Sequence, residues 1–194
     1  MKRVKWAKLP MGAAALILLA APMRAQKPDQ QSEQDKQMQA AMQAAQPGAV
    51  HQMLAKRVGE WTIATKVWMQ PGAPPSESTG TAKITSILGG RFLREEGSGT
   101  FMGQPSSGMR LWGYNNGTKQ YEAMWTYTGS TAILMLKGTS SDDGKTVSYT
   151  GTVEDAQKVT LRVEARQIDD DHFVVTLKGE DNGAYLEEAY TRKK

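Results

Sequence analysis

Val58-Gly59-Glu60-Trp61 is the stretch that decides the fold, because the spacing of the apolar residues changes across it. Upstream, apolar residues repeat at helical spacing over residues 49–57, which predicts a short helix with Gly59 as its left-handed C-terminal cap. Downstream, Trp61 and Ile63 begin an alternation with a period of two, the pattern of a strand. We expect Trp61 to point into the floor of a barrel made by the strands that follow.

Nine further segments alternate apolar and polar residues and predict strands. They are residues 77–88, 91–97, 108–114, 119–127, 130–137, 145–153, 158–168, 172–178 and 184–192. Typical hairpin turns, in which Asn, Asp and Gly tolerate positive φ, are Asn115-Asn116-Gly117, Asp142-Asp143-Gly144 and Asp181-Asn182-Gly183. About ten strands joined by short turns predict an all-β, closed antiparallel barrel, because closure removes exposed strand edges.

Residues 1–25 have the organisation of an export signal. The first eight residues include four basic side chains, and an apolar run over residues 11–21 follows. This run is shorter than the ~20 apolar residues of a membrane span. We therefore expect cleavage after Ala25, or alternatively after Ala21, and delivery to the periplasm or the medium. An uncleaved signal anchor is the remaining alternative.

The charge of the chain depends on this cleavage. The full chain has 24 basic and 20 acidic residues, and residues 1–25 contain five of the basic ones and none of the acidic ones. The remaining 19 basic and 20 acidic residues give a net charge of −1, so no nucleic-acid-binding face is predicted. Residues 26–48 are rich in Gln and Ala and predict a flexible or partly helical tether. A narrow dimer contact through the stripe of Met38, Met42 and Ala45 is the alternative.

Two sets of residues resemble known families. Gly59-Glu60-Trp61 resembles the Gly-x-Trp opening of calycin barrels, the group of lipocalins, fatty-acid-binding proteins and nitrobindins. In those families a basic residue near the end of the last strand packs across the tryptophan, and Arg192 occupies the matching place. A second set is similar to the bacterial family called domain of unknown function 1579, and comprises His51, Leu54, Gly59-Glu60-Trp61, Gly89-Gly90-Arg91-Phe92-Leu93, Gly113-Tyr114-Asn115 and Trp125.

The resemblance implies a lipocalin-like barrel domain over residues 49–194. In that barrel Gly59, Trp61 and Arg192 would hold structural positions at the closed end. The resemblance implies no activity, because none is established for the family.

Charged residues on two predicted strands are candidates for a binding site inside the barrel. If Phe92 points inward, Arg94 and Glu96 do so too, because alternate residues share a strand face. On the last strand, the same rule brings Glu188 and Tyr190 inward. Isolated buried charges are costly, so these groups must pair with one another or face a wet cavity. We interpret them as anchors for the polar end of a small ligand; the alternative is an ion-pair network that closes the barrel.

Aromatic residues extend this candidate lining. Tyr121 and Trp125 share one strand face, either as core filling or as the wall of an apolar cavity. No catalytic residue, metal site or cofactor is predicted, because the chain has no cysteine and its two histidines lack the spacing of metal motifs. Of these, His172 should face solvent, which argues against a haem ligand.

These patterns support three functions of different classes. The first is an exported, non-catalytic module that binds a small, mainly apolar molecule inside the barrel. The second is an enzyme, an isomerase or hydrolase that works in the barrel with Glu96 or Glu188 as acid or base. The third is a module that contacts another envelope protein through the tether or the barrel rim, which a completely filled interior would favour.

Overall fold

The computed structural model describes residues 28–70, 72–154, 158–179 and 184–194. In these ranges two helices, α1 (Pro28–Ala44) and α2 (Ala49–Ala55), precede ten strands. The strands are β1 (Gly59–Val67), β2 (Ser76–Ile87), β3 (Phe92–Phe101), β4 (Gln104–Asn115), β5 (Gln120–Tyr127), β6 (Leu134–Ser140), β7 (Thr146–Glu154), β8 (Lys158–Gln167), β9 (His172–Lys178) and β10 (Ala184–Arg192). The predicted signal segment, residues 1–25, and the predicted turn Asp181-Asn182-Gly183 lie outside the described residues.

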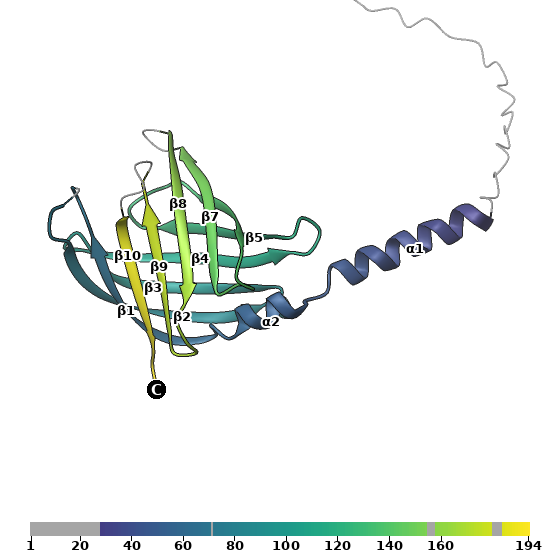
Figure 1. The fold of residues 1–194 in the computed structure, drawn as a ribbon, viewed down its shortest axis with the longest axis horizontal. Coiled ribbons are helices and arrows are strands. Elements are labelled where there is room, and N and C mark those ends of the chain that lie inside the picture. The colour runs from purple at the N-terminus through teal and green to yellow at the C-terminus, as the bar shows by residue number, and fades with distance from the viewer. Residues whose placement is uncertain (1–27, 71, 155–157, 180–183) are drawn as a thin grey trace, which may run out of the picture. The chain divides into compact units, whose positions relative to one another are not determined.

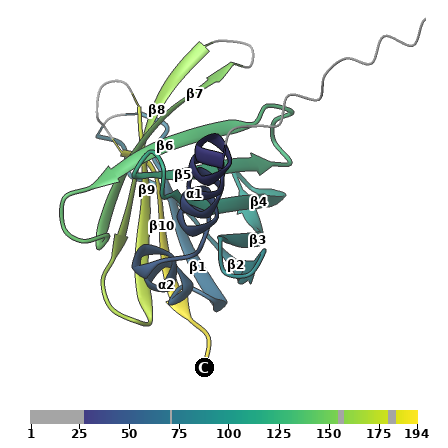
Figure 2. The same ribbon diagram turned by 90° about the vertical axis from the view of Figure 1, so that its right-hand side faces the viewer.

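The ten strands form a closed antiparallel barrel within the compact unit of residues 40–194 (Figures 1 and 2). Each strand pairs with the next one along the chain, and β1 pairs with β10 to complete the circle. The predicted antiparallel barrel is therefore confirmed. Strand bounds differ from the predicted ones by up to four residues: β6 begins at Leu134 instead of residue 130, β4 begins at Gln104 instead of residue 108, and β3 ends at Phe101 instead of residue 97.

Helix α1 lies within the segment that the sequence predicts as a tether. Its side chains from residue 32 onward are exposed, including those of Met38 and Met42. Neither described helix is long and apolar enough to span a membrane.

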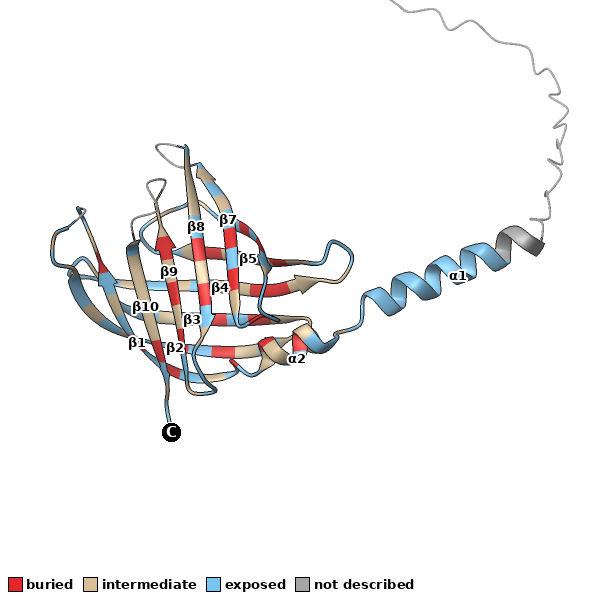
Figure 3. Ribbon diagram, in the orientation of Figure 1, coloured by how far each residue is buried: buried red, intermediate tan, exposed pale blue. Residues whose placement is uncertain are grey.

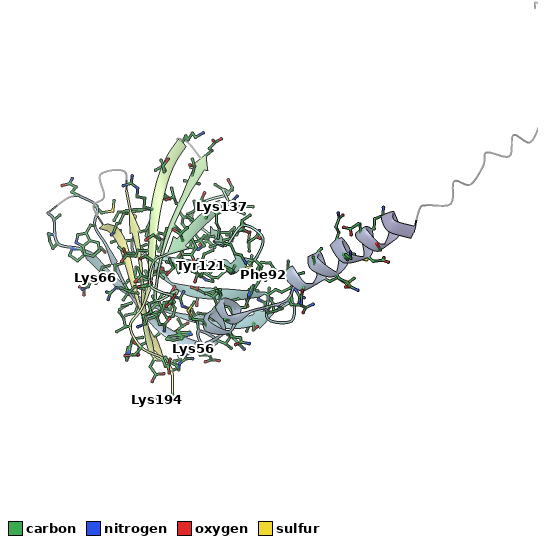
Figure 4. The ribbon with its side chains drawn as sticks, turned by 45° about the vertical axis from the view of Figure 1, so that its right-hand side comes forward. Lys56, Lys66, Phe92, Tyr121, Lys137 and Lys194 are labelled. Atoms are coloured by element: carbon green, nitrogen blue, oxygen red, sulfur yellow. The ribbon has the colours of Figure 1, made fainter. Side chains whose placement is uncertain are left out.

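Alternate side chains along each strand point into the barrel and form its core, which gives the banded colouring of the strands in Figure 3. In Figure 4, Tyr121 lies among the strands, whereas Lys66 and Lys137 lie at the periphery. Trp61 is fully buried, and its indole N–H donates a hydrogen bond to the Arg57 carbonyl at 2.9 Å. The guanidinium of Arg192 lies 4.2 Å from the centre of the indole ring. Trp61 therefore closes one end of the barrel with Arg192 against it, as the sequence predicts.

Arg192 also fixes α2 to this end of the barrel. Its Nη1 donates to the Val58 carbonyl at 2.8 Å and its Nη2 donates to the Lys56 carbonyl at 2.7 Å, which satisfies carbonyls just beyond the helix. The helix ends at Ala55 with Lys56 as its right-handed cap, so the prediction that Gly59 caps it is wrong. Gly59 is needed for another reason: its φ is +147°, and a Cβ there would lie 2.5 Å from Nη1 of Arg192.

Candidate functional site

A cavity of about 290 Å³ occupies the half of the barrel away from Trp61 and Arg192. All ten strands contribute to its lining, with the largest shares from β3 and β4. Because the β strands alternate, only the inward positions of these segments set its chemistry. The barrel interior is therefore filled with side chains at one end and hollow at the other.

The cavity has two walls of different chemistry. Strands β2 to β4 contribute small residues at their inward positions, which are Gly80, Gly97, Gly99, Ser106 and Gly108. Their outward-pointing neighbours Thr79, Ser98, Thr100 and Ser107 border the cavity only at its edge. Strands β6 to β10 contribute aliphatic residues, which are Leu134, Val153, Leu161, Leu177 and Leu186. This combination of an apolar wall and a few polar groups is typical of small-molecule pockets.

The floor of the cavity is a charged cluster of Glu95, Arg110 and Glu188, with Tyr190 and Trp112 bonded to it. Arg110 binds Glu188 through both guanidinium nitrogens, with Nη1 to Oε2 at 2.6 Å and Nη2 to Oε1 at 2.9 Å. The same Nη1 lies 3.3 Å from Oε1 of Glu95. Glu95 also accepts hydrogen bonds from the Tyr190 hydroxyl at 2.7 Å and from the Trp112 indole at 2.9 Å. Every charged group of the cluster is therefore paired.

Burial and the neighbouring charges shift the pKa values of two members of this cluster, Tyr190 and Arg110. Burial is the main effect on the Tyr190 hydroxyl and raises its pKa well above the usual value, since a phenolate would be poorly solvated there. For Arg110 burial acts to lower the pKa, but the neighbouring charges, chiefly that of Glu188, raise it well above the usual value. Arg110 stays a cation, and Tyr190 stays a neutral hydrogen-bond donor.

Trp125 forms part of the cavity wall directly above Arg110. The guanidinium carbon lies 4.3 Å from the centre of the Trp125 ring, a cation–π contact. The indole nitrogen of Trp125 is buried and has no hydrogen-bond partner among the described residues. A buried N–H without an acceptor costs about 1–3 kcal/mol of stability.

Four of the predicted binding residues lie inside the barrel. Trp125 and Glu188 line the cavity. Tyr190 is buried beneath Arg110, and its hydroxyl belongs to the charged cluster. Tyr121 is buried at a distance from the cavity, where its ring packs edge-on against Tyr149. Of these four residues, two therefore form the cavity wall, one belongs to the charged cluster beneath it, and one belongs to the hydrophobic core.

Arg94 and Glu96, by contrast, point out of the barrel, so the predicted inward orientation of these two residues is wrong. Their side chains are 44% and 55% exposed and form an ion pair with each other at 3.4 Å. The reason lies in the pairing of β3 with β2, which puts Glu95 directly opposite the buried Ile84. Directly paired residues share a sheet face, so Glu95 points inward and both of its neighbours point outward.

Sequence reasoning missed Glu95 and Arg110, the two residues that complete the cluster with Glu188. The composition of the strand faces did not identify Glu95. In the predicted strand 91–97 each face carries two charges, Arg94 with Glu96 on one and Arg91 with Glu95 on the other. Only the observed start of β3 at Phe92 leaves Glu95 as the single charge on its face. Arg110 shares its face with Trp112, two residues along β4, and this spacing was the available signal.

The histidines lie away from the cavity. His172 is half exposed, as predicted, and its Nδ1 lies 2.8 Å from Oδ1 of Asp169. His51 is buried in α2, where its Nδ1 accepts a hydrogen bond from the Gly48 backbone at 3.1 Å. Within the part of the chain that the structure describes, no three His, Cys, Asp or Glu side chains are grouped so that they could hold a metal ion.

A closed ten-stranded antiparallel barrel with a hollow half and a tryptophan–arginine seal defines a protein of the lipocalin-like class. More narrowly, the chain belongs to the family described as "Protein of unknown function (DUF1579)", whose model matches residues 46–192. The family and fold predicted from the sequence are thus confirmed.

Solved structures share this fold at low sequence identity. Rv2717c from M. tuberculosis is 16% identical, with 77% of this chain and 100% of that chain covered and a TM-score of 0.57. The S-type phycobiliprotein lyase CPES from Guillardia theta is 11% identical, with 76% and 94% covered and a TM-score of 0.52. No curated protein matches the sequence. At these identities the likeness shows the barrel fold alone.

Proposed function

We propose that this protein binds a small, mainly apolar molecule in the hollow half of its barrel and does not transform it. The observation that carries the proposal is the cavity of about 290 Å³, with an aliphatic wall and a paired, charged floor. An empty core would be unfavourable, because residual cavity volume costs about 24 cal/mol per Å³. A barrel whose interior served only its own stability would be filled at both ends.

Gly97 supports the view that the space serves a ligand. It occupies an inward position of β3, two residues above Glu95, and lines the cavity. A Cβ at Gly97 would meet the Thr81 carbonyl at 3.6 Å and Ala82 at 4.0 Å, which are ordinary contacts. Backbone packing therefore does not require glycine here. At Gly99, by contrast, a Cβ would lie 2.9 Å from the Gly80 backbone.

The enzymatic alternative has less support than binding. Of its two candidate acid–base residues, Glu96 points away from the cavity. Glu188 faces the cavity, but both of its carboxylate oxygens are bonded to Arg110. A general base must be free to take a proton from the substrate, so this arrangement favours a structural anchor over a catalyst.

The N-terminal sequence supports a proposal about the compartment in which the protein acts. The basic start, the short apolar run and the small residue at Ala25 support export, so binding would take place in the periplasm or the medium. Cell fractionation with N-terminal sequencing of the recovered protein tests this. A protein starting at Gln26 or Pro22 outside the cytoplasm is the expected result, and retention of Met1 in the cytoplasm would contradict it.

The binding proposal is tested with the neutral fluorescent reporter N-phenylnaphthylamine. The wild-type protein should bind it with enhanced emission, and Gly97→Leu, which fills the cavity, should weaken binding by about tenfold or more. Thr81→Leu is the matched control, because it adds the same side chain on the exposed outer face of β2. Equal binding by all three proteins, or no binding by any of them, would contradict the proposal.

A further inference from the structure

Three loops at the open end of the barrel, the end away from Trp61, carry exposed apolar side chains. They join β1 to β2 (residues 68–75), β3 to β4 (residues 102–103) and β5 to β6 (residues 128–133), and none of their residues is charged. Each loop contains one strongly exposed apolar residue: Met69 is 63% exposed, and Met102 and Ile133 are each 55% exposed. These three side chains are called the apolar rim below.

The three loops are neighbours in space. Strands β1 to β6 follow one another without interruption around the barrel, so the loops that join them in pairs occupy one continuous side of its open edge. The exposed apolar residues of the rim therefore belong to one surface. A gathered set of this kind marks an interaction surface, whereas single exposed apolar residues are ordinary.

The loops at the sealed end have the opposite composition. All four strand-to-strand loops there contain charged residues, which are Arg91, Lys119, Asp142, Asp143, Lys145, Asp169, Asp170 and Asp171. Charged and polar side chains are what loops facing water normally carry. The contrast between the two ends indicates that the apolar rim has a partner other than water.

The apolar rim continues into the wall of the cavity. Phe101 and Tyr127, at the ends of β3 and β5, both line the cavity, and their rings pack edge-on with centres 6.4 Å apart. Tyr185 on β10 also lines the cavity, and like Tyr127 it is partly exposed. An apolar molecule can therefore pass from the rim to the cavity over aromatic side chains. Tyrosine is also enriched where proteins meet the boundary between membrane and water.

A lipid bilayer is the partner that fits this arrangement. A bilayer accepts apolar side chains that protrude from separate loops, and it is the phase in which a mainly apolar ligand is most concentrated. A second copy of the chain docked on the rim would instead block the mouth of the cavity. The connections from β7 to β8 and from β9 to β10 contain Asp155, Glu180 and Asp181 and no basic residue, so the chain offers no attraction for anionic head groups there.

We propose that the apolar rim docks on the surface of a neutral lipid bilayer, without spanning it, and that the cavity exchanges its ligand there. The docking depends on the rim alone, whereas the exchange rests on the proposed binding function.

Site-specific labelling tests the orientation of docking, because the chain has no cysteine of its own. A nitrobenzoxadiazole dye attached to Met102→Cys should gain fluorescence by about twofold or more when phosphatidylcholine vesicles are added, since the dye enters the boundary of the acyl region. Leu88→Cys is the matched control. Leu88 is likewise an exposed apolar turn residue, with a φ of 51° against 52° for Met102, but it lies at the sealed end. No change at either position, or equal changes at both, would overturn the proposal.

Vesicle sedimentation tests the contribution of the rim side chains. Met102→Ser/Ile133→Ser should bind phosphatidylcholine vesicles at least about tenfold more weakly than the wild type, because binding scales with the apolar area that enters the interface. Leu88→Ser/Met135→Ser removes two apolar side chains of similar exposure, 68% and 60%, from other surfaces of the barrel. This control should bind within about twofold of the wild type. Equal losses in both double variants, or binding that requires added phosphatidylglycerol, would overturn the proposal.

The reporter assay separates this proposal from the proposed function. Binding of N-phenylnaphthylamine, measured without vesicles, should be unchanged in Met102→Ser/Ile133→Ser, because neither residue lines the cavity. Reporter binding without vesicle binding by the wild type would overturn the docking and leave the proposed function standing. Vesicle binding without reporter binding would support the docking and overturn the exchange of ligand. A concentration-dependent dimer in size-exclusion chromatography that disappears in the same double variant would identify a second copy as the occupant and overturn the lipid assignment.

Discussion

Removal of Arg110 is the sharpest test of the charged cluster. In Arg110→Met, an unbranched apolar chain replaces the guanidinium between Glu95 and Glu188, whose side chains are only 4% and 12% exposed. Removing one partner of a buried ion pair typically costs 3–5 kcal/mol, because the remaining charge is left unsolvated and unpaired. We expect a loss of about 4 kcal/mol in the free energy of unfolding, which is roughly 10 °C in Tm for a domain of this size.

The same reasoning predicts that Arg110→Met and Glu188→Gln have strongly non-additive effects on the free energy of unfolding. That single change leaves Arg110 paired with Glu95 and should cost about 2 kcal/mol, the value of hydrogen bonds to a charged group. The double variant Arg110→Met/Glu188→Gln should cost about 4 kcal/mol and not the sum of the two, because one of the two buried carboxylates that Arg110 neutralises has then been removed. The coupling energy is then about 2 kcal/mol.

Urea unfolding followed by tryptophan fluorescence measures all four proteins of this cycle. Arg94→Met is the matched control, because Arg94 is an exposed arginine paired with a carboxylate, and its loss should cost less than about 1 kcal/mol. A cost for Arg110→Met below about 1 kcal/mol, or single effects that add within about 0.5 kcal/mol, would refute the argument that these charges form one buried unit.

Three further predictions concern the sealed end and the buried phenol. Gly59→Ala should lower stability by about 2 kcal/mol in urea unfolding, because it strains a positive φ and displaces Arg192; a neutral effect would contradict the close approach. Arg192→Lys should cost about 2 kcal/mol, since an ammonium cannot make the same fork of bonds to the Lys56 and Val58 carbonyls, and an unchanged Tm would argue against that role. Because burial raises the folded-state pKa of Tyr190, its contribution to stability is complete below about pH 10, where unfolded tyrosine ionises, and falls as the pH rises further. Tyr190→Phe should therefore flatten the decline of the urea midpoint above about pH 10, and an equally steep decline would contradict the assignment.

The candidate site shows where sequence reasoning succeeds and where it fails. Glu188 and Tyr190 were placed inward correctly, because β10 carries an apolar residue, Leu186, on the same face. In β3 both faces start with an apolar residue, Phe92 or Leu93, so the alternation alone does not say which face is buried. The choice of Phe92 put the wrong charges inside the barrel.

The sequence by itself determined the strands, their antiparallel order and the closed end of the barrel. These features follow from local alternation, from short turns and from the Gly59 and Trp61 pattern, all of which are read within a few residues. Tertiary structure alone decided which carboxylate meets Arg110 and that half of the interior is hollow. The orientation of β3 depends on its register with β2 and β4, and the cavity depends on side-chain volumes summed over nearly all the strands. Neither the orientation of β3 nor the size of the cavity can therefore be read from a single segment of the chain.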